Sequence, residues 1–226
     1  MTLGLFITGT DTGVGKSLAA AALLHALARH HTRVLGMKPV AAGAEPHEGQ
    51  LTNQDAVLLR AASTMAVPPE LDNPVLLPEP LSPHIAAARA GVRIAIPAIA
   101  ASYRQLAARA DAVVVEGAGG FHVPLSDTET GADLAQTLGL PVVLVVGLRL
   151  GCLSHAALTF DAIRARGLML AGWIANRVDP HMQAPDENIA WLRQHLQAPL
   201  LADLPHQHRP DARALAARYR LPAHWT

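Results

Sequence analysis

The chain has little of several features that mark secreted, membrane-bound and nucleic-acid-binding proteins. Cys152 is the single cysteine among 226 residues, which excludes an internal disulfide and indicates a reducing compartment. No apolar run approaches the ~20 residues that a membrane-spanning helix requires, and the N-terminus lacks the pattern of a signal peptide. The 18 basic and 18 acidic residues cancel, and they form no basic stripe for a nucleic acid. We therefore expect a cytoplasmic protein that binds neither nucleic acid nor membrane.

Histidine is plentiful but does not form a metal-binding pattern. The closest pairs are His30 with His31 and His206 with His208, and neither pair has the cysteine or carboxylate neighbours of a zinc site. Solvated surface histidines are the better interpretation.

Short apolar runs alternate with helical segments along almost the whole chain. The expected strands are residues 3–8, 34–37, 112–116, 142–146, 170–175 and 200–204. The expected helices are residues 17–30, 53–63, 96–110, 132–138, 154–166, 186–197 and 211–220. Continuous apolar strands are typical of a sheet that is covered on both faces. We predict a three-layer α/β/α fold with a mostly parallel central sheet, forming one domain over residues 1–226.

Residues 66–97 interrupt this alternation. They hold many of the chain's 17 prolines, and helical spacing is limited to a short stretch at residues 84–89. The pattern predicts an irregular excursion with one short helix, too short to form a second domain.

The first apolar run leads into a glycine-rich segment. Residues 9–17 read Gly-Thr-Asp-Thr-Gly-Val-Gly-Lys-Ser and are followed by an alanine- and leucine-rich helical segment. Glycines let backbone N–H groups surround an anion, and the start of a helix adds partial positive charge. Lys16 can reach terminal phosphates, and the Ser17 hydroxyl can ligate Mg²⁺. This order predicts a P-loop NTPase-like triphosphate site rather than a plain turn, although five residues instead of four separate Gly9 from Gly15.

Three more polar residues are expected at the same edge of the sheet. Lys38 follows one predicted strand, Glu116 ends another before a run of glycines, and Asp55 opens a helix. Taken singly, they could be a surface lysine, a turn residue and a helix-start carboxylate. Taken together, Ser17, Asp55 and Glu116 supply the oxygen ligands that Mg²⁺ prefers.

The ordered set of motifs resembles the dethiobiotin synthetases of biotin biosynthesis over nearly the whole chain. That family has the same long spacing in its phosphate loop. Further matches are Lys38-Pro39-Val40, the Asp55 segment, and residues 82–84, 116–120, 124–127, 150–152, 172–176 and the Pro205 region.

The resemblance implies ATP- and Mg²⁺-dependent carboxylation of 7,8-diaminononanoate with CO₂ or bicarbonate. Ring closure then gives dethiobiotin, ADP and phosphate, through a carbamate and a carbamic–phosphoric anhydride. By resemblance, Lys16 and Lys38 are catalytic, and Ser17, Asp55 and Glu116 hold the metal. The implied nucleotide-binding residues are Thr12, Gly13, Val14, Gly15, Lys16, Ser17, Asp55, Glu116, Asn176 and Pro205. The implied substrate-binding residues are Thr12, Lys38, Ala42, Gly119, Leu150, Cys152 and Ser154.

The resemblance also implies a homodimer in which the helix start at residues 150–154 of the partner holds the substrate carboxylate. The chain departs from some members at three positions. Gly13 replaces an acidic residue, Ala42 replaces a serine near the diamine, and Ser154 replaces an asparagine but is still expected to cap the helix.

Other interpretations remain open at this stage. A partitioning-type nucleotide-switch ATPase has a related phosphate loop, but such proteins carry a second lysine before Gly-Lys, whereas Lys16 is the loop's only lysine. An inactive, binding-only relative is disfavoured by intact Lys16, Lys38, Asp55 and Glu116. Cys152 at a helix start could be an activated thiol, but packing is the better interpretation.

Overall fold

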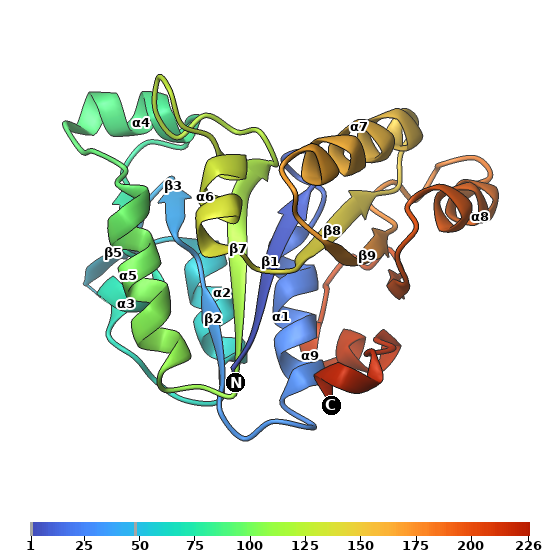
Figure 1. The fold of residues 1–226 in the computed structure, drawn as a ribbon, viewed down its shortest axis with the longest axis horizontal. Helices are drawn as coiled ribbons and strands as arrows, with labels where there is room; N and C mark the ends of the chain where they lie inside the picture. The colour runs from blue at the N-terminus through green and yellow to red at the C-terminus, as the bar shows by residue number, and fades with distance from the viewer. Residues whose placement is uncertain (1, 48) are drawn as a thin grey trace.

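The computed structural model describes residues 2–47 and 49–226. The strands of its central sheet are β1 (Leu3–Gly9), β2 (Val34–Met37), β7 (Ala112–Gly120), β8 (Val142–Gly147), β9 (Leu170–Asn176) and β10 (Leu200–Leu204). They pair in the order β10-β9-β8-β1-β7-β2, and every pairing is parallel. All six predicted strands are confirmed, and their carboxyl ends point the same way (Figure 1).

Helices cover both faces of this sheet. One face carries α1 (Lys16–Leu27), α2 (Gln54–Ala62) and α9 (Ala212–Leu215); the other carries α5 (Ile96–Ala107), α6 (Gly131–Leu138), α7 (Cys152–Ala165) and α8 (Pro185–His195). Side chains of β1 alternate between the two cores: Leu5 and Ile7 pack with α1, whereas Phe6 packs with α5 and α6. The predicted three layers are confirmed. Among the described residues, no helix is long and apolar enough to cross a bilayer.

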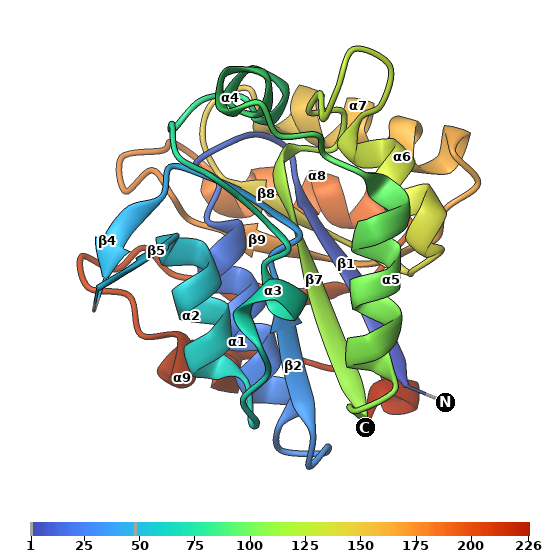
Figure 2. The ribbon, with the colours of Figure 1, turned by 90° about the vertical axis from the view of Figure 1, so that its left-hand side faces the viewer.

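The sequence pattern missed several short elements that lie between β2 and residue 83 in the chain, some of which are labelled in Figure 2. They are β3 (Val40–Ala42) paired parallel with β6 (Val75–Leu77), the hairpin of β4 (Glu45–His47) and β5 (Gln50–Thr52), and helix α3 (Pro69–Asp72). Elements of three or four residues are too short to show a hydrophobic period. The excursion at residues 66–97 is therefore more regular than expected, and its predicted short helix is confirmed as α4 (Pro83–Ala90).

Several predicted boundaries were wrong. The helices expected to end at residues 30 and 110 end at Leu27 and Ala107. The strand expected to end at Glu116 continues as β7 to Gly120, because Gly120 pairs with Gly9 of β1. The helix expected over residues 211–220 consists of α9 and a 3-10 turn, η1 (Ala216–Arg218).

The C-terminal segment leaves the helical path because it packs elsewhere. The Tyr219 hydroxyl donates to the carbonyl of Ala19 in α1 at 2.6 Å, and the Arg220 N–H donates to the carbonyl of Leu201 at 2.8 Å. Leu221 precedes Pro222, and a residue before proline disfavours the helical conformation. A last 3-10 turn, η2 (Ala223–Trp225), buries Trp225 against α1.

Candidate functional site

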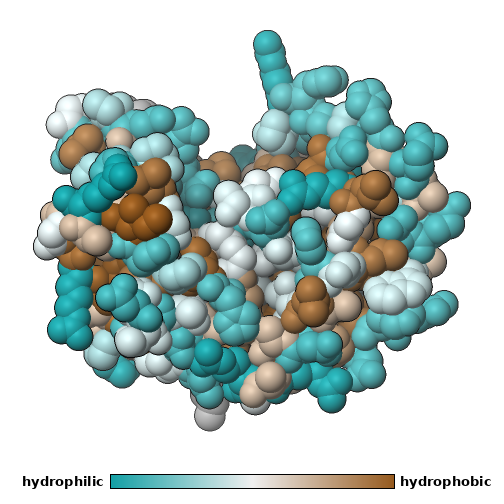
Figure 3. Space-filling model, turned by 90° about the horizontal axis from the view of Figure 1, so that it is seen from above, coloured by the Kyte–Doolittle hydropathy of each residue, from teal (hydrophilic) through white to brown (hydrophobic). Residues whose placement is uncertain are grey.

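The glycine-rich loop connects β1 to α1 at the carboxyl edge of the sheet. Gly15 precedes the helix with a φ of 81°, and a Cβ there would lie 2.1 Å from Nδ2 of Asn176. The same Nδ2 atom donates to the carbonyl of Val14 at 2.9 Å, so the end of β9 supports the loop. Figure 3 looks down on this edge, which is hollowed between its two sides. Only glycine fits at position 15, as a phosphate-binding turn requires.

Lys16 lies at the first position of α1 and is 7% exposed. Its Nζ atom donates to the carbonyl of Asp11 at 2.9 Å, across the turn of the loop. Burial lowers the pKa of Lys16 from 10.5 to about 8, although the nearby Glu116 carboxylate opposes that shift. The ammonium is therefore protonated near neutral pH but poorly solvated, and a phosphate in the loop would stabilise it.

Lys38, Asp55, Glu116 and Ser17 form one hydrogen-bonded cluster beside the loop. Nζ of Lys38 lies 2.8 Å from Oδ2 of Asp55 and 2.6 Å from Oε1 of Glu116. The Ser17 hydroxyl donates to the same Oε1 atom at 2.8 Å. Asp55 is placed by Asn53, whose side chain caps α2 by accepting from the Asp55 N–H at 3.0 Å. The structure thus brings together the residues that the sequence assigned to one edge.

The protonation states in this cluster follow from its charges. Burial alone would lower the pKa of Lys38, but Glu116 and Asp55 outweigh it and raise that pKa above its ordinary value. Burial alone would raise the pKa of Asp55, but the Lys38 ammonium outweighs it and lowers that pKa. Lys38 is therefore a fixed cation, and Asp55 is a carboxylate at neutral pH.

The cluster fits a hard divalent cation. Glu116 is fully buried, and its Oε2 atom has no hydrogen-bond partner among the described residues. A buried carboxylate oxygen without a partner is costly unless a cation binds it. The neighbouring donors, Ser17 and Asp55, also present oxygen, which is the ligand that Mg²⁺ prefers.

Two adjoining cavities meet at Lys38. The first, of about 430 Å³, is lined by the loop residues Thr12, Gly13, Gly15, Lys16 and Ser17, and also by Leu18, Lys38, Asp55, Glu116 and Gly119. The second, of about 590 Å³, shares Thr12, Lys38, Asp55 and Gly119 with the first and extends along Val40, Ala42, Pro80, Leu81, Ser82, Pro83, Ala118 and Val123. The first cavity has the composition of a triphosphate site. The second offers an apolar path that begins at the lysine.

Asn176 and Pro205 lie at neighbouring strand ends. Asn176 ends β9 and pairs with Leu204, the last residue of β10, directly before Pro205. The Nδ2 atom of Asn176 donates one hydrogen bond to Val14, and no hydrogen bond between described residues involves its Oδ1 atom.

The helix start at residues 150–154 differs from the expectation. Helix α7 begins at Cys152 with Gly151 as its N-cap, so Ser154 lies inside the first turn and does not cap the helix. Cys152 is buried, and burial raises the pKa of its thiol, as expected for a packing residue rather than a nucleophile. Leu150, by contrast, is 96% exposed.

Arg149 is a residue of this edge that the sequence motifs missed. Its guanidinium forms an ion pair with Asp11 of the glycine-rich loop. The pair joins the loop to the segment before α7, 138 residues away in the chain. A lone arginine after a strand carries no local signal, so only the fold reveals this contact.

Curated relatives match the chain over almost its full length. It is 56% identical over 219 residues to the ATP-dependent dethiobiotin synthetase BioD of Aromatoleum aromaticum, covering 96% of each chain. It is 58% identical over 212 residues to the ATP-dependent dethiobiotin synthetase BioD of Ralstonia nicotianae, covering 94% of this chain and 93% of the relative.

Solved structures with the same fold are much more distant in sequence. The septum site-determining protein MinD of Pyrococcus horikoshii, in complex with Mg-ADP, has 18% identity and a TM-score of 0.56, covering 92% of this chain and 82% of its own. A ParA family ATPase of Chlorobium tepidum also has 18% identity and a TM-score of 0.56, and the match covers 92% of this chain and 86% of that ATPase. These likenesses establish a P-loop NTPase fold. The family model described as an AAA domain matches residues 3–213. Because its high identity to the BioD proteins extends over almost the whole length, the chain belongs to the family of ATP-dependent dethiobiotin synthetases, which are ligases.

Proposed function

We propose that the protein carboxylates 7,8-diaminononanoate with CO₂ and closes the ureido ring of dethiobiotin, with ATP converted to ADP and phosphate. The observation that carries the proposal is the meeting of the triphosphate cavity and the apolar cavity at Lys38. A substrate in the second cavity would present its reacting end to the terminal phosphate in the first. Phosphoryl transfer depends mainly on such positioning and on neutralisation of charge.

The proposed reaction, as the family resemblance implies it, has three chemical steps. One substrate amine adds to the carbon of CO₂ and releases a proton, giving a carbamate. A carbamate oxygen attacks the γ-phosphorus, and ADP leaves, giving a carbamic–phosphoric anhydride. The second amine attacks the carbonyl carbon, phosphate leaves, and loss of a proton completes the ring.

The two lysines have separate roles in this scheme. Lys16, buried in the loop, binds the β- and γ-phosphate oxygens once they displace its bond to the Asp11 carbonyl. Lys38 keeps its proton and places a positive charge where the carbamate forms, at the junction of the two cavities. Charge held ready at the site of a developing anion lowers the barrier without reorganisation.

The metal position is assigned to Ser17, Asp55 and Glu116. The orphaned Oε2 atom of Glu116 supports this choice. Bound there with ATP, Mg²⁺ supplies neutralisation of phosphate charge. Asn176 and Pro205 are assigned to the purine because they lie at the ends of β9 and β10, beside the loop.

The diamine is assigned to the second cavity. Gly119 has a φ of 54°, and a Cβ there would lie 3.2 Å from Val123 and 3.5 Å from the Thr12 hydroxyl, so the absence of a side chain keeps the cavity open. Ala42 lines the same cavity with a methyl group. The aliphatic chain of the substrate would pack against these apolar walls.

The distal carboxylate of the substrate is assigned to the partner subunit of a homodimer. Its seven-carbon spacer reaches about 9–10 Å from the amines, by the same bond-length reasoning that limits an extended chain. The described residues that line the diamine cavity include none from α7. The start of α7 instead carries the exposed side chain of Leu150, and Leu158 on the same helix is 66% exposed. Exposed apolar residues before and along this helix suit an interface that delivers its N-terminus to a second copy. The single cysteine supports placing the enzyme in the cytoplasm.

Phosphate release tests the proposed reaction. With Mg-ATP and bicarbonate, the protein should release phosphate only when 7,8-diaminononanoate is added, and mass spectrometry should detect dethiobiotin in equal amount. Phosphate release that ignores the diamine would favour the nucleotide-switch ATPase instead. ATP binding without turnover in either condition would indicate a binding-only relative.

A further inference from the structure

Lys38 lies where the chain passes from one sheet to another. Met37, the last residue of β2, pairs with Val115 of β7, and Val40, the first residue of β3, pairs with Val75 of β6. Lys38 is in neither ladder, yet it is only 4% exposed. Buried backbone N–H and C=O groups need hydrogen-bond partners. Whatever binds the main chain of Lys38 also sets where its side chain begins.

The segment formed by α3 and the residues just after it supplies both partners. The Lys38 N–H donates to the carbonyl of Asp72 at 2.7 Å. The side-chain Nδ2 of Asn73 donates to the carbonyl of Lys38 at 2.7 Å. The Val75 N–H then donates to the carbonyl of Pro39 at 3.1 Å. Of these three bonds, only the one from Asn73 depends on a side chain.

This segment is itself anchored to α2. Asp72 is 4% exposed, and its carboxylate accepts two hydrogen bonds from Arg60, at 2.8 and 2.5 Å. Arg60 lies on the helix whose first turn carries Asp55, the partner of the Lys38 ammonium. Helix α2 therefore fixes two parts of Lys38. Asp55 binds its ammonium directly, and Arg60 holds Asp72, whose carbonyl accepts from the Lys38 N–H.

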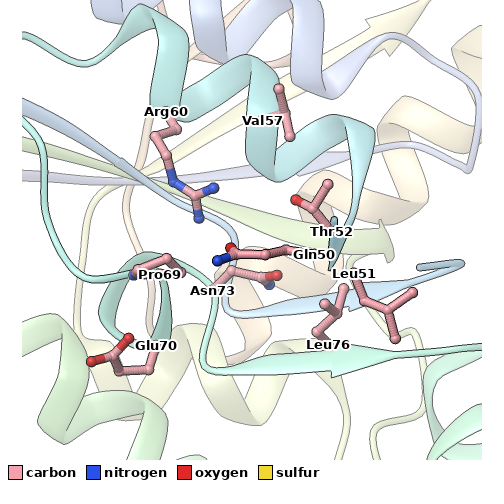
Figure 4. Close-up of a pocket in the computed structure, with 9 residues that line it drawn as sticks. All are labelled: Gln50, Leu51, Thr52, Val57, Arg60, Pro69, Glu70, Asn73 and Leu76. Carbon is pink, nitrogen blue, oxygen red and sulfur yellow. The ribbon is translucent and has the colours of Figure 1, made fainter. Parts of the chain in front are cut away.

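Behind the segment lies a separate cavity of about 500 Å³, lined by Gln50, Leu51, Thr52, Val57, Arg60, Pro69, Glu70, Asn73 and Leu76. Figure 4 shows Arg60 and Gln50 directed toward each other in it, with Asn73 alongside Gln50. Asn73 lines this cavity and Lys38 does not, so truncation of Asn73 would enlarge the cavity and leave the Lys38 carbonyl without this donor.

We propose that Asn73 is a positioning residue for Lys38, and this inference rests on the proposed role of Lys38 in the reaction. The Asn73 amide holds the Lys38 carbonyl and so directs the ammonium to the junction of the two cavities. The hydrogen bond that ends α3 does not need the Asn73 side chain. The backbone N–H of Asn73 makes that bond, to the carbonyl of Pro69 at 2.8 Å. Misplacement of a catalytic group by about 1 Å can cost as much as ~100-fold in rate.

The test compares Asn73→Ala with a neighbour that lines the same cavity. Asn73→Ala should lower kcat for diamine-dependent phosphate release about tenfold, since the displacement is partial, while the Kd for ATP stays within about twofold. Glu70→Ala is the matched control because Glu70 is exposed and lies on the same segment, and it should leave both values unchanged. Asn73→Ser keeps a hydrogen-bond donor on a shorter side chain, so it should lower kcat by an intermediate factor. It replaces Asn73→Ala in the test if that variant does not fold.

A double variant separates positioning from a general structural effect. In single-turnover measurements, adding Asn73→Ala to Lys38→Ala should cost less than about twofold more, because residues that act through one another are not additive. A full tenfold further loss would overturn the inference, as would an unchanged kcat in a folded Asn73 variant or an equal loss of ATP affinity.

A crystal structure of Asn73→Ala gives a readout that does not depend on turnover. The Lys38 ammonium should be displaced from Glu116 by about 1 Å or more, and an unmoved ammonium would contradict the proposal. If the unsubstituted protein shows no diamine-dependent turnover, the proposed function fails, and this displacement still decides whether Asn73 positions Lys38.

Discussion

At the scale of single residues, two buried lysines stand close to the same carboxylates but are held differently. Lys16 is bound within its own loop, through the Asp11 carbonyl, whereas Lys38 is bound by Asp55 and Glu116 from two other elements. The first arrangement suits a residue that exchanges a backbone partner for phosphate. The second suits a residue whose charge is fixed before substrates arrive.

We therefore expect the two lysines to separate binding from turnover. Lys16→Ala should abolish turnover and weaken ATP binding, because phosphate charge in the loop would be unbalanced. Lys38→Ala should lower kcat about 10²- to 10³-fold, the usual cost of losing a preorganised charge, with a smaller change in the Kd for ATP. Steady-state rates and calorimetric ATP titrations measure both. Near-normal turnover of Lys38→Ala at saturating substrate would remove its catalytic role.

The two carboxylates proposed to hold the metal give a second prediction at this scale. Asp55→Asn and Glu116→Gln should each raise the Mg²⁺ concentration needed for half-maximal activity about tenfold or more, because a hard cation loses an anionic oxygen ligand. Asp161→Asn, an exposed change on α7, is the control and should leave the Mg²⁺ titration unchanged. If all three curves coincide with that of the unsubstituted protein, neither carboxylate holds the metal.

At the scale of elements, the start of α6 is a capping box tied to the end of α7. Oδ2 of Asp133 accepts from the backbone N–H and the hydroxyl of Thr130, each at 2.7 Å, and Oδ1 accepts from Arg166 at 2.5 Å. Burial opposes these bonds, but they outweigh it and lower the pKa of Asp133 from 3.8 to about 2. The cap therefore needs the ionised carboxylate.

The depressed pKa makes this cap depend on pH. Asp133→Ala should lower the free energy of unfolding by about 1–2 kcal/mol at pH 7, the usual cost of an N-terminal cap. The stabilisation by Asp133 is fully present above the pKa of the unfolded chain, near 4, and is lost as pH falls through about 2. Urea unfolding should thus show the two proteins converging at low pH. Asp127→Ala, in the exposed loop before α6, should match the unsubstituted protein throughout, and a constant difference between pH 7 and pH 2 would rule out the ionised cap.

At the scale of the whole molecule, we expect each active site to combine the phosphate loop of one subunit with the start of α7 of the other, in a twofold dimer. In that case, Lys16→Ala and Ser154→Glu, each inactive alone, should complement each other when mixed. A mixed dimer would hold one site with both lesions and one with neither, because a twofold axis creates two shared sites.

Random subunit exchange should therefore restore up to about a quarter of the full activity, since half of the dimers are mixed and half of their sites are intact. Phosphate release after exchange measures this recovery, and native mass spectrometry verifies that exchange occurred. Exchange without any recovery would mean that a single chain holds the carboxylate.

The expectations of a single domain and of no nucleic-acid partner stay predictions.

Features that depend on neighbouring residues were predictable from the sequence. The phosphate loop is one, because strand, glycines, lysine and helix follow one another in nine consecutive positions. The three-layer sheet is another, because continuous apolar strands require cover on both faces. Family membership also followed from the order and spacing of motifs, and the relatives confirm it.

Only the tertiary structure decided how distant segments meet. Glu116 reaches Ser17 across 99 residues and Lys38 across 78, and β7 runs on to Gly120 because Gly9 pairs with it. The Asn73 amide on Lys38 and the Arg149 ion pair with the loop have no sequence signature at all. Hydrophobic periodicity records which face of an element is buried, but it carries no information about which other element covers that face. The family and the candidate site residues were therefore visible in the sequence, whereas the groups that hold Lys38 in place became visible only in the fold.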